Sequence, residues 1–161
     1  MKKIMLTPII AALVLSGCIG NPKTAFVEAC SEIMKDRLKS PSSYQVLDSS
    51  DILYEPFTLE YWEKNNPMDK YADLDKVKFW QSMRDLAEQQ EKNGNNKVAK
   101  IIIKYEAKNA YGTPIASEML CKYETKGPEV PSDVDDFNLF EVHVNGMTKS
   151  DWLMSQIKKI R

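Results

Sequence analysis

The side chains that most often carry out enzyme chemistry are scarce in this sequence of 161 residues. Its single histidine, His143, lies between Val142 and Val144, where strand alternation predicts a solvated surface position. A catalytic triad would need that histidine and a serine on a G-x-S-x-G elbow, which is absent. A glycine-rich phosphate loop and a set of zinc ligands at the usual spacing are also absent. The sequence therefore predicts no enzyme, cofactor, metal site or small-molecule substrate.

The acidic residues raise two further possibilities, calcium binding and glycoside hydrolysis. Asp133, Asp135 and Asp136 cluster in one loop, but the glycine and the distal glutamate of an EF-hand-type calcium loop are missing. We therefore expect a solvated acidic loop. Glycoside hydrolysis uses two carboxylates at a suitable distance in space, and nothing in the sequence singles out such a pair.

The most unusual feature of the composition is an aromatic segment. Seven of the fifteen aromatic residues fall within 27 positions: Tyr54, Phe57, Tyr61, Trp62, Tyr71, Phe79 and Trp80. Phe79 and Trp80 fit the apolar stripe of a helix. The first four lie in a segment interrupted by Pro56, which leaves two interpretations. They form either an exposed surface for a partner protein or glycan, or a satellite core beneath a loop.

Hydrophobic periodicity predicts three helices. The first begins at Asn21-Pro22, a capping residue followed by a proline at the first helical position, and ends at Ser40-Pro41. The second runs from Asp73 to Lys92. Thr148 and Asp151 resemble a capping box for the last helix. The apolar stripes are Phe26, Cys30, Ile33, Met34 and Leu38 in the first helix, Val77, Phe79, Trp80, Met83, Leu86 and Ala87 in the second, and Trp152, Leu153, Ile157 and Ile160 in the last.

Alternation of apolar and polar residues predicts the strands. The clearest pair is a hairpin over residues 99–107 and 115–123, in which alternate side chains face a core. A short strand is expected over 44–47, an edge strand or irregular segment over 52–62, and a third strand over 139–144 that buries Phe140, Val142 and Val144. The predicted fold is α+β: a small antiparallel sheet of three to five strands with about three helices packed on one face.

The amino terminus has the pattern of a secretion signal. Lys2 and Lys3 precede an apolar stretch from Ile4 to Leu15, and small residues follow it. Twelve residues of helix span only about 18 Å, which is too short for a hydrocarbon core of about 30 Å. A permanent transmembrane anchor is therefore not expected.

The tetrapeptide Leu15-Ser16-Gly17-Cys18 resembles the lipobox of bacterial lipoproteins. That resemblance implies lipidation of the Cys18 thiol, cleavage before Cys18 and acylation of the new amino terminus. We therefore expect residues 1–17 to be a signal peptide, 18–21 a lipidated anchor with a short tether, and 22–161 a single periplasmic domain. Ile19 replaces the aspartate typical of inner-membrane retention, which implies the outer membrane; a Gram-positive host would make this rule irrelevant.

Lipidation of Cys18 leaves Cys30 and Cys121 as an even pair in an oxidising compartment. Both lie on the apolar faces of their predicted elements, so that both point into one core. We expect a disulfide between them, with two free buried thiols as the alternative.

The body of the chain is also similar to small, mostly uncharacterised bacterial envelope proteins that mobile elements often encode. In these a helix with a cysteine precedes an L-K-x-P-x-S segment, and a hairpin with a second cysteine follows. The matching stretches here are Leu38-Lys39-Ser40-Pro41-Ser42-Ser43 and residues 107–121. The resemblance implies the same disulfide pairing and no particular activity.

Charge and the anchor together direct the functional expectation. Without residues 1–17 the chain has 20 basic and 23 acidic residues, so it lacks the basic excess of a nucleic-acid-binding protein. Lys158, Lys159 and Arg161 suit the carboxyl end of a helix. We expect a lipid-anchored, non-enzymatic envelope module that binds another protein, with exclusion or toxin immunity as the roles that the mobile-element resemblance implies. The alternatives are a structural accessory of a secretion or assembly machine and, last, a small cell-wall hydrolase.

Overall fold

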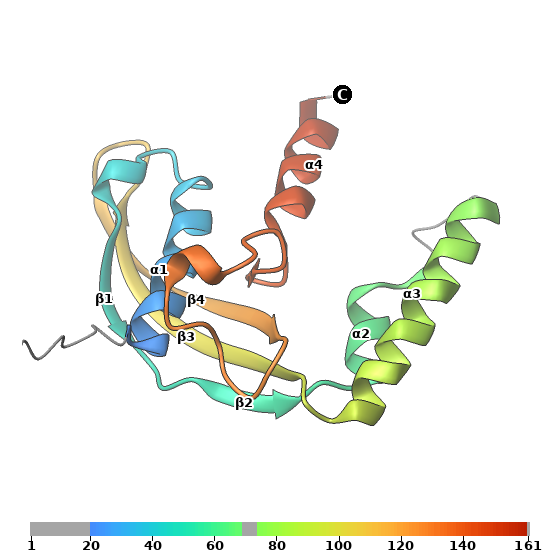
Figure 1. Ribbon diagram of the computed structural model, residues 1–161. Coiled ribbons are helices and arrows are strands. Elements are labelled where there is room, and N and C mark those ends of the chain that lie inside the picture. The colour runs from blue at the N-terminus through green and yellow to red at the C-terminus, as the bar shows by residue number, and fades with distance from the viewer. Residues whose placement is uncertain (1–19, 69–73, 161) are drawn as a thin grey trace, which may run out of the picture.

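The computed structural model describes residues 20–68 and 74–160, and it has the predicted α+β architecture (Figure 1). The predicted signal peptide, the lipobox with Cys18 and the predicted helix start at Asp73 lie outside the described residues. Within them, no helix is long and apolar enough to cross a bilayer. The elements are α1 (Pro22–Lys35), η1 (Pro41–Ser43), β1 (Gln45–Ser49), β2 (Leu53–Pro56), α2 (Leu59–Asn65), α3 (Leu74–Asn93), β3 (Lys97–Lys108), β4 (Pro114–Thr125), η3 (Val134–Asp136), β5 (His143–Val144) and α4 (Lys149–Ile160).

A long antiparallel hairpin of β3 and β4 forms the centre of the sheet. β1 and β2 pair one after the other with the free edge of β3, and β5 pairs with β4. In the turn of the hairpin, the Asn109 side chain accepts hydrogen bonds from the backbone N–H groups of Tyr111 and Thr113. The predicted alternation is confirmed, because one face of β3 is buried throughout: Ala99, Ile101, Ile103, Tyr105 and Ala107.

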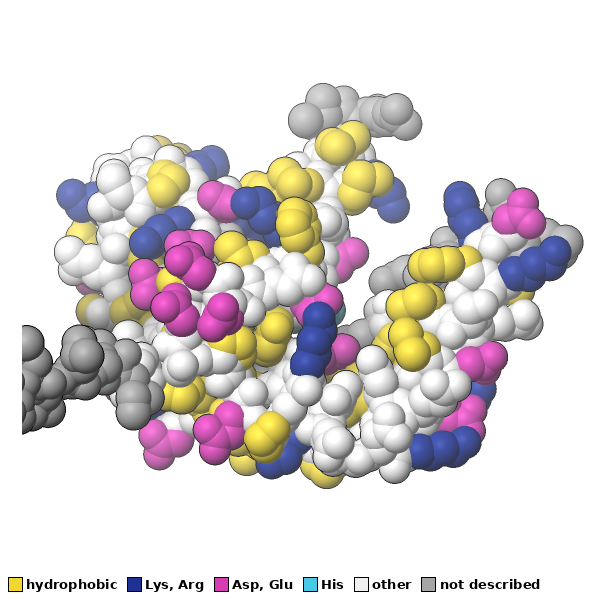
Figure 2. All heavy atoms as spheres, in the orientation of Figure 1, with side chains coloured by type: hydrophobic (Ala, Val, Ile, Leu, Met, Phe, Trp, Pro, Cys, Tyr) yellow, Lys and Arg dark blue, Asp and Glu magenta, His cyan; other side chains and the backbone are white. Residues whose placement is uncertain are grey.

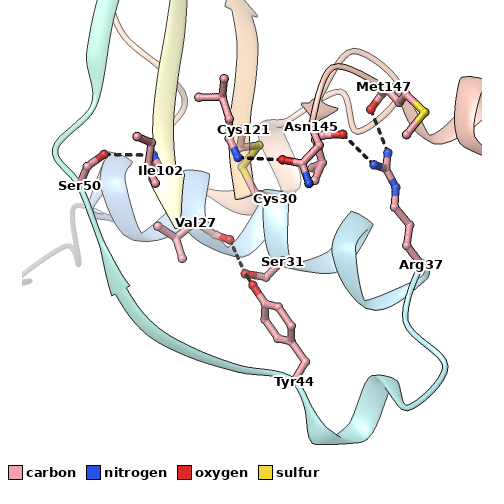
Figure 3. Close-up of a disulfide and its surroundings, with 12 residues drawn as sticks. Val27, Cys30, Ser31, Arg37, Tyr44, Ser50, Ile102, Cys121, Asn145 and Met147 are labelled. Carbon is pink, nitrogen blue, oxygen red and sulfur yellow. Dashed lines mark hydrogen bonds between the residues drawn. A yellow bond between two sulfur atoms is a disulfide. The ribbon is translucent and has the colours of Figure 1, made fainter. Parts of the chain in front are cut away.

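The helix α1 covers this buried face of the sheet. Asn21 caps its start as predicted, since the Asn21 side-chain oxygen accepts hydrogen bonds from the N–H groups of Lys23 and Thr24. The buried side chains of α1 pack against β3, β4 and β5 in the main core. The predicted disulfide is present: Cys30 of α1 is joined to Cys121 of β4 across a sequence separation of 91 residues (Figure 3).

A second, smaller core lies on the other face of the sheet. Successive strand residues point to opposite faces, so Val98 points away from the main core that contains Ala99. Val98 packs with Phe57, Trp62 and Ala87, which brings α2 and α3 against that end of the sheet. The helices therefore occupy both faces of the sheet rather than the one face predicted, because the aromatic segment supplies a second apolar surface.

Hydrogen bonds from the start of α4 and from the segment after α1 hold the connection between β5 and α4. The predicted capping box is present, since the Thr148 hydroxyl accepts a hydrogen bond from the Asp151 N–H and the Asp151 carboxylate accepts one from the Thr148 N–H. Arg37, just after α1, donates to the carbonyl oxygens of Val144 at 2.7 Å and Met147 at 2.9 Å (Figure 3). From this base α4 projects away from the sheet, as α3 does at the end of the molecule (Figure 1).

The third predicted strand is much shorter than expected. Only His143 and Val144 form β5, although Val142 and Val144 are buried as predicted. Phe140 is 70 % exposed, which contradicts its predicted burial. The reason is local: the Glu141 N–H donates a hydrogen bond to the Asn138 carbonyl oxygen, and this tight turn ends the alternation before β5 begins.

Candidate functional site

Two adjoining cavities lie between α2, α3 and the start of α4. The first has a volume of about 360 Å³ and the second about 190 Å³. Trp62, Glu124 and Glu141 line both, so the two cavities are parts of one depression. We call this depression the acidic groove and these three shared residues its floor. The start of α4 lines the first cavity through Asp151, and α3 lines the second through Met83, Leu86 and neighbouring residues.

Two separate parts of the chain bring the floor carboxylates together. Glu124 lies on β4 directly after Tyr123, whose side chain is in the main core, so strand alternation turns Glu124 to the opposite face. In the hairpin register Glu124 lies beside Val98, a member of the second core. Glu141 comes from the tight turn before β5. The floor is therefore built where the second core meets the loop that leads into α4.

The electrostatics of the floor favour a cation. Burial, and next the charge of Glu141, raise the pKa of Glu124 to about 7. Neither Glu124 nor Glu141 takes part in the ion pairs found among residues 20–68 and 74–160. Lys126 and His143 are the basic residues that line the described groove, Lys126 in the second cavity and His143 in the first. A basic group placed between the two carboxylates would relieve their repulsion.

Exposed apolar side chains continue the α3 wall of the groove outward. On α3, Phe79, Met83 and Leu86 are spaced by four and three residues, so they share one helix face, and all three are exposed. On α4, Met154 and Ile157 are also exposed, but the residues that line the groove at the start of α4 are Thr148 and Asp151. In Figure 2 hydrophobic side chains form a row along α3 and a second group on α4. The amphipathic pattern of both helices was predicted; the exposure of these stripes was not.

The aromatic segment is not the exposed patch that the partner-surface interpretation requires. Phe57 and Trp62 are buried, with 4 % and 9 % of their surface exposed, and Tyr54 and Tyr61 are half-buried. Trp62 packs against Trp80 of α3 with ring centroids 5.7 Å apart, and the Trp80 indole donates a hydrogen bond to the Asn66 carbonyl oxygen. The satellite core was the correct alternative, because α2 and α3 enclose these rings against the sheet.

Outside the floor of the groove, the residues that the sequence singled out are His143 and the three aspartates of one loop. Asp133, Asp135 and Asp136 are exposed around η3, in agreement with the predicted solvated loop. His143 points away from the main core as predicted, but it is half-buried and lines the first cavity instead of being fully solvated. Among the described residues, no group of three or more histidine, cysteine, aspartate or glutamate side chains is arranged to hold a metal ion.

No family model, curated protein or solved structure matches this chain. The acidic groove is therefore interpreted from its own geometry. Two features of the sequence hide this groove. Glu124 looked like an ordinary polar position on the outer face of a hairpin, and Glu141 was assigned to a longer strand. The usable signal was the aromatic cluster before α3, which indicated a second core and therefore a second enclosed region.

Proposed function

We propose that this protein is a lipid-anchored component of the bacterial cell envelope that binds another protein, without enzymatic activity, through the acidic groove. The observation that carries the proposal is the exposed apolar face of α3, formed by Phe79, Met83 and Leu86, of which Met83 and Leu86 line the groove. Contiguous exposed apolar surface rimmed by polar residues is typical of protein interaction sites.

The position of the lipid anchor favours binding of a partner on the side of the molecule that faces away from the bilayer. The lipobox places Cys18 four residues before Pro22, the first residue of α1, so the tether extends at most about 14 Å. In Figure 1 the start of α1 and the helix α3 lie at opposite ends of the molecule. A domain held at the outer membrane by Cys18 would thus direct α3 into the periplasm, where an envelope protein can reach it.

The size of the exposed apolar surface suggests a specific but moderate affinity. Covering the exposed part of each of these three side chains contributes on the order of 1 kcal/mol. Their sum, about 3 kcal/mol, lies just below the association cost of about 4–15 kcal/mol. Apolar contacts alone therefore leave little net affinity, and polar contacts at the floor of the groove must supply the rest.

In-cell photo-cross-linking tests this proposal. The cross-linking amino acid p-benzoylphenylalanine replaces Phe140 or Phe79, with the same replacement at Tyr111 as the control, because Tyr111 is 93 % exposed at the distant hairpin turn. We expect one discrete protein adduct from the two groove positions and none from Tyr111, and we expect it to disappear in the Cys18→Ser variant. Absence of any groove-specific adduct would refute binding of a protein at the groove.

The identity of the partner would distinguish the possible roles of the complex. Exclusion or immunity requires a partner that arrives from outside, such as an entry factor or toxin, whereas a structural accessory requires a resident envelope machine. Mass spectrometry of the adduct distinguishes them, since it identifies the partner directly.

One observation favours a second candidate, a small cell-wall hydrolase. Glu124 is partly protonated near neutral pH beside Glu141, and glycoside hydrolases use a protonated and an ionised carboxyl group. Release of soluble fragments from purified peptidoglycan, lost in Glu124→Gln, would establish this activity. We expect none, because the exposed apolar face of α3 beside the groove favours a protein partner.

A further inference from the structure

We propose that the acidic groove receives an amphipathic helix of the partner protein, whose apolar face packs against α3 and whose lysine or arginine reaches Glu124 and Glu141. This inference rests on the proposed function and specifies the chemistry of the partner. Three features of the groove support it: the form of its α3 wall, the charge of its floor and the aromatic side chains at its edge.

The α3 wall of the groove has the form that a helix fits. Phe79, Met83 and Leu86 make an exposed ridge along one face of α3. A ridge of this kind packs against the side of another helix, and the helix axes then lie about 8–10 Å apart. Helix-in-groove recognition uses apolar anchors on the inserted helix at intervals of three and four residues, so the partner helix should carry its apolar residues at that spacing.

The charge of the floor determines which polar group the partner helix must bring. Glu124 and Glu141 face a shared space, lack ion pairs among the described residues and repel each other. The carboxyl group of Asp151 lines the same depression at the start of α4. A lysine ammonium or an arginine guanidinium satisfies two carboxylates at once, and arginine can do so with paired hydrogen bonds. Lipid phosphates and nucleic acids carry the wrong charge for this floor.

Aromatic side chains add a further preference for a cation. Trp62 belongs to the floor, and Phe140, which is 70 % exposed, stands at the edge of the first cavity. The faces of aromatic rings attract lysine and arginine side chains, and the attraction strengthens when the contact is shielded from water. A basic residue in the middle of an otherwise apolar helix face would therefore contact carboxylates and aromatic rings in the same groove.

The experiment adds a charge change to the photo-cross-linking assay. The probe stays at Phe140, and Glu141 is changed to Gln or Lys. The matched control is the same pair of changes at Glu118, an exposed carboxylate six residues from Glu124 along β4 and therefore about 20 Å away. We expect the adduct to fall about tenfold in Glu141→Lys and several-fold in Glu141→Gln, and to stay within about twofold in both Glu118 variants.

Peptide mapping and a binding titration complete the test. The cross-linked segment of the partner should be a helix with a lysine or arginine flanked by apolar residues at three- or four-residue intervals. A synthetic peptide of that segment should bind the detergent-solubilised, lipidated chain about tenfold more tightly than the same peptide with its basic residue changed to glutamine. This preference should vanish in Glu141→Gln, and melting curves of each variant show that it is folded.

The possible outcomes separate the two proposals. An adduct that persists unchanged in Glu141→Lys, or maps to a segment without a basic residue, overturns the helix-and-cation inference while leaving the protein-binding function in place. No adduct in the unaltered chain overturns both. An adduct that consists of two copies of this chain shows that the groove serves self-association, and it refutes the inference of a separate partner.

Discussion

The raised pKa of Glu124 predicts how the stability of the protein depends on pH. This prediction can be tested without knowing the partner. In the folded protein Glu124 keeps its proton up to about pH 7, whereas in the unfolded chain a glutamate loses it near pH 4.5. Between these values the folded state binds more protons than the unfolded state. Its stability therefore decreases as the pH rises from about 4.5 to about 7, and the penalty stays constant above that.

Glutamine has nearly the shape of glutamate and no charge, so Glu124→Gln removes this penalty. The difference between the two pKa values corresponds to about 3 kcal/mol, which we reduce to about 2–3 kcal/mol because the side chain is only half-buried. For a domain of this size, 1 kcal/mol shifts the melting temperature by roughly 3–4 °C. We expect Glu124→Gln to raise Tm by about 6–12 °C at pH 8 and to leave it nearly unchanged at pH 4.5.

Thermal unfolding followed by circular dichroism at both pH values measures this effect. Glu141→Gln should give a smaller rise at pH 8, since it removes the repulsion but leaves Glu124 buried. Glu118→Gln is the control on the same strand, and a change within about 0.5 kcal/mol is expected because its ion pair with Lys104 is exposed. A decrease in Tm at pH 8 would show that the folded state stabilises the Glu124 carboxylate. Equal shifts at pH 4.5 and pH 8 would show that folding does not raise the pKa of Glu124.

Three further predictions concern the anchor and the two cores. The Cys18→Ser variant should incorporate no labelled palmitate, and unchanged labelling would exclude the lipoprotein assignment. Reduction of the bridge between Cys30 and Cys121 should destabilise the domain by about 4–5 kcal/mol in the chain-entropy account, since it closes a loop with a sequence separation of 91 residues; a Tm that is insensitive to reductant would contradict this. The Trp62→Ala variant should lose about 3–5 kcal/mol of stability through removal of a buried indole, and a near-native Tm would show that Trp62 is not part of a core.

Local sequence signals predicted the elements whose partners are close or whose pattern is strong. Asn21-Pro22 fixed the start of α1, and Thr148 with Asp151 fixed the start of α4, because a cap depends only on side chains within one helical turn. The hairpin was predictable because side chains alternate between the two faces of a strand, whatever packs on the sheet. The disulfide was predictable because both cysteines lay on apolar faces.

The short helix α2 was within reach of the same reasoning and was missed. Thr58 caps it, and the Thr58 hydroxyl accepts a hydrogen bond from the Tyr61 N–H at 3.1 Å. Seven residues are too few to show a helical period, and Pro56, three residues before Leu59, suggested an interrupted strand. The strand β2 and the helix α2 both exist, and they meet at Phe57, which the second core buries.

The acidic groove, by contrast, is a product of tertiary structure. Glu124 and Glu141 are 17 positions apart and carry no mark of their pairing, because the pKa of a carboxyl group depends on neighbours that the fold brings near and on the water that it excludes. The sequence determined that Phe79, Met83 and Leu86 lie on one apolar helix face. Only the packing of α2 and α3 on the second face of the sheet decided that this face remains uncovered beside a negatively charged floor, since periodicity specifies the direction of a side chain and not what lies opposite it.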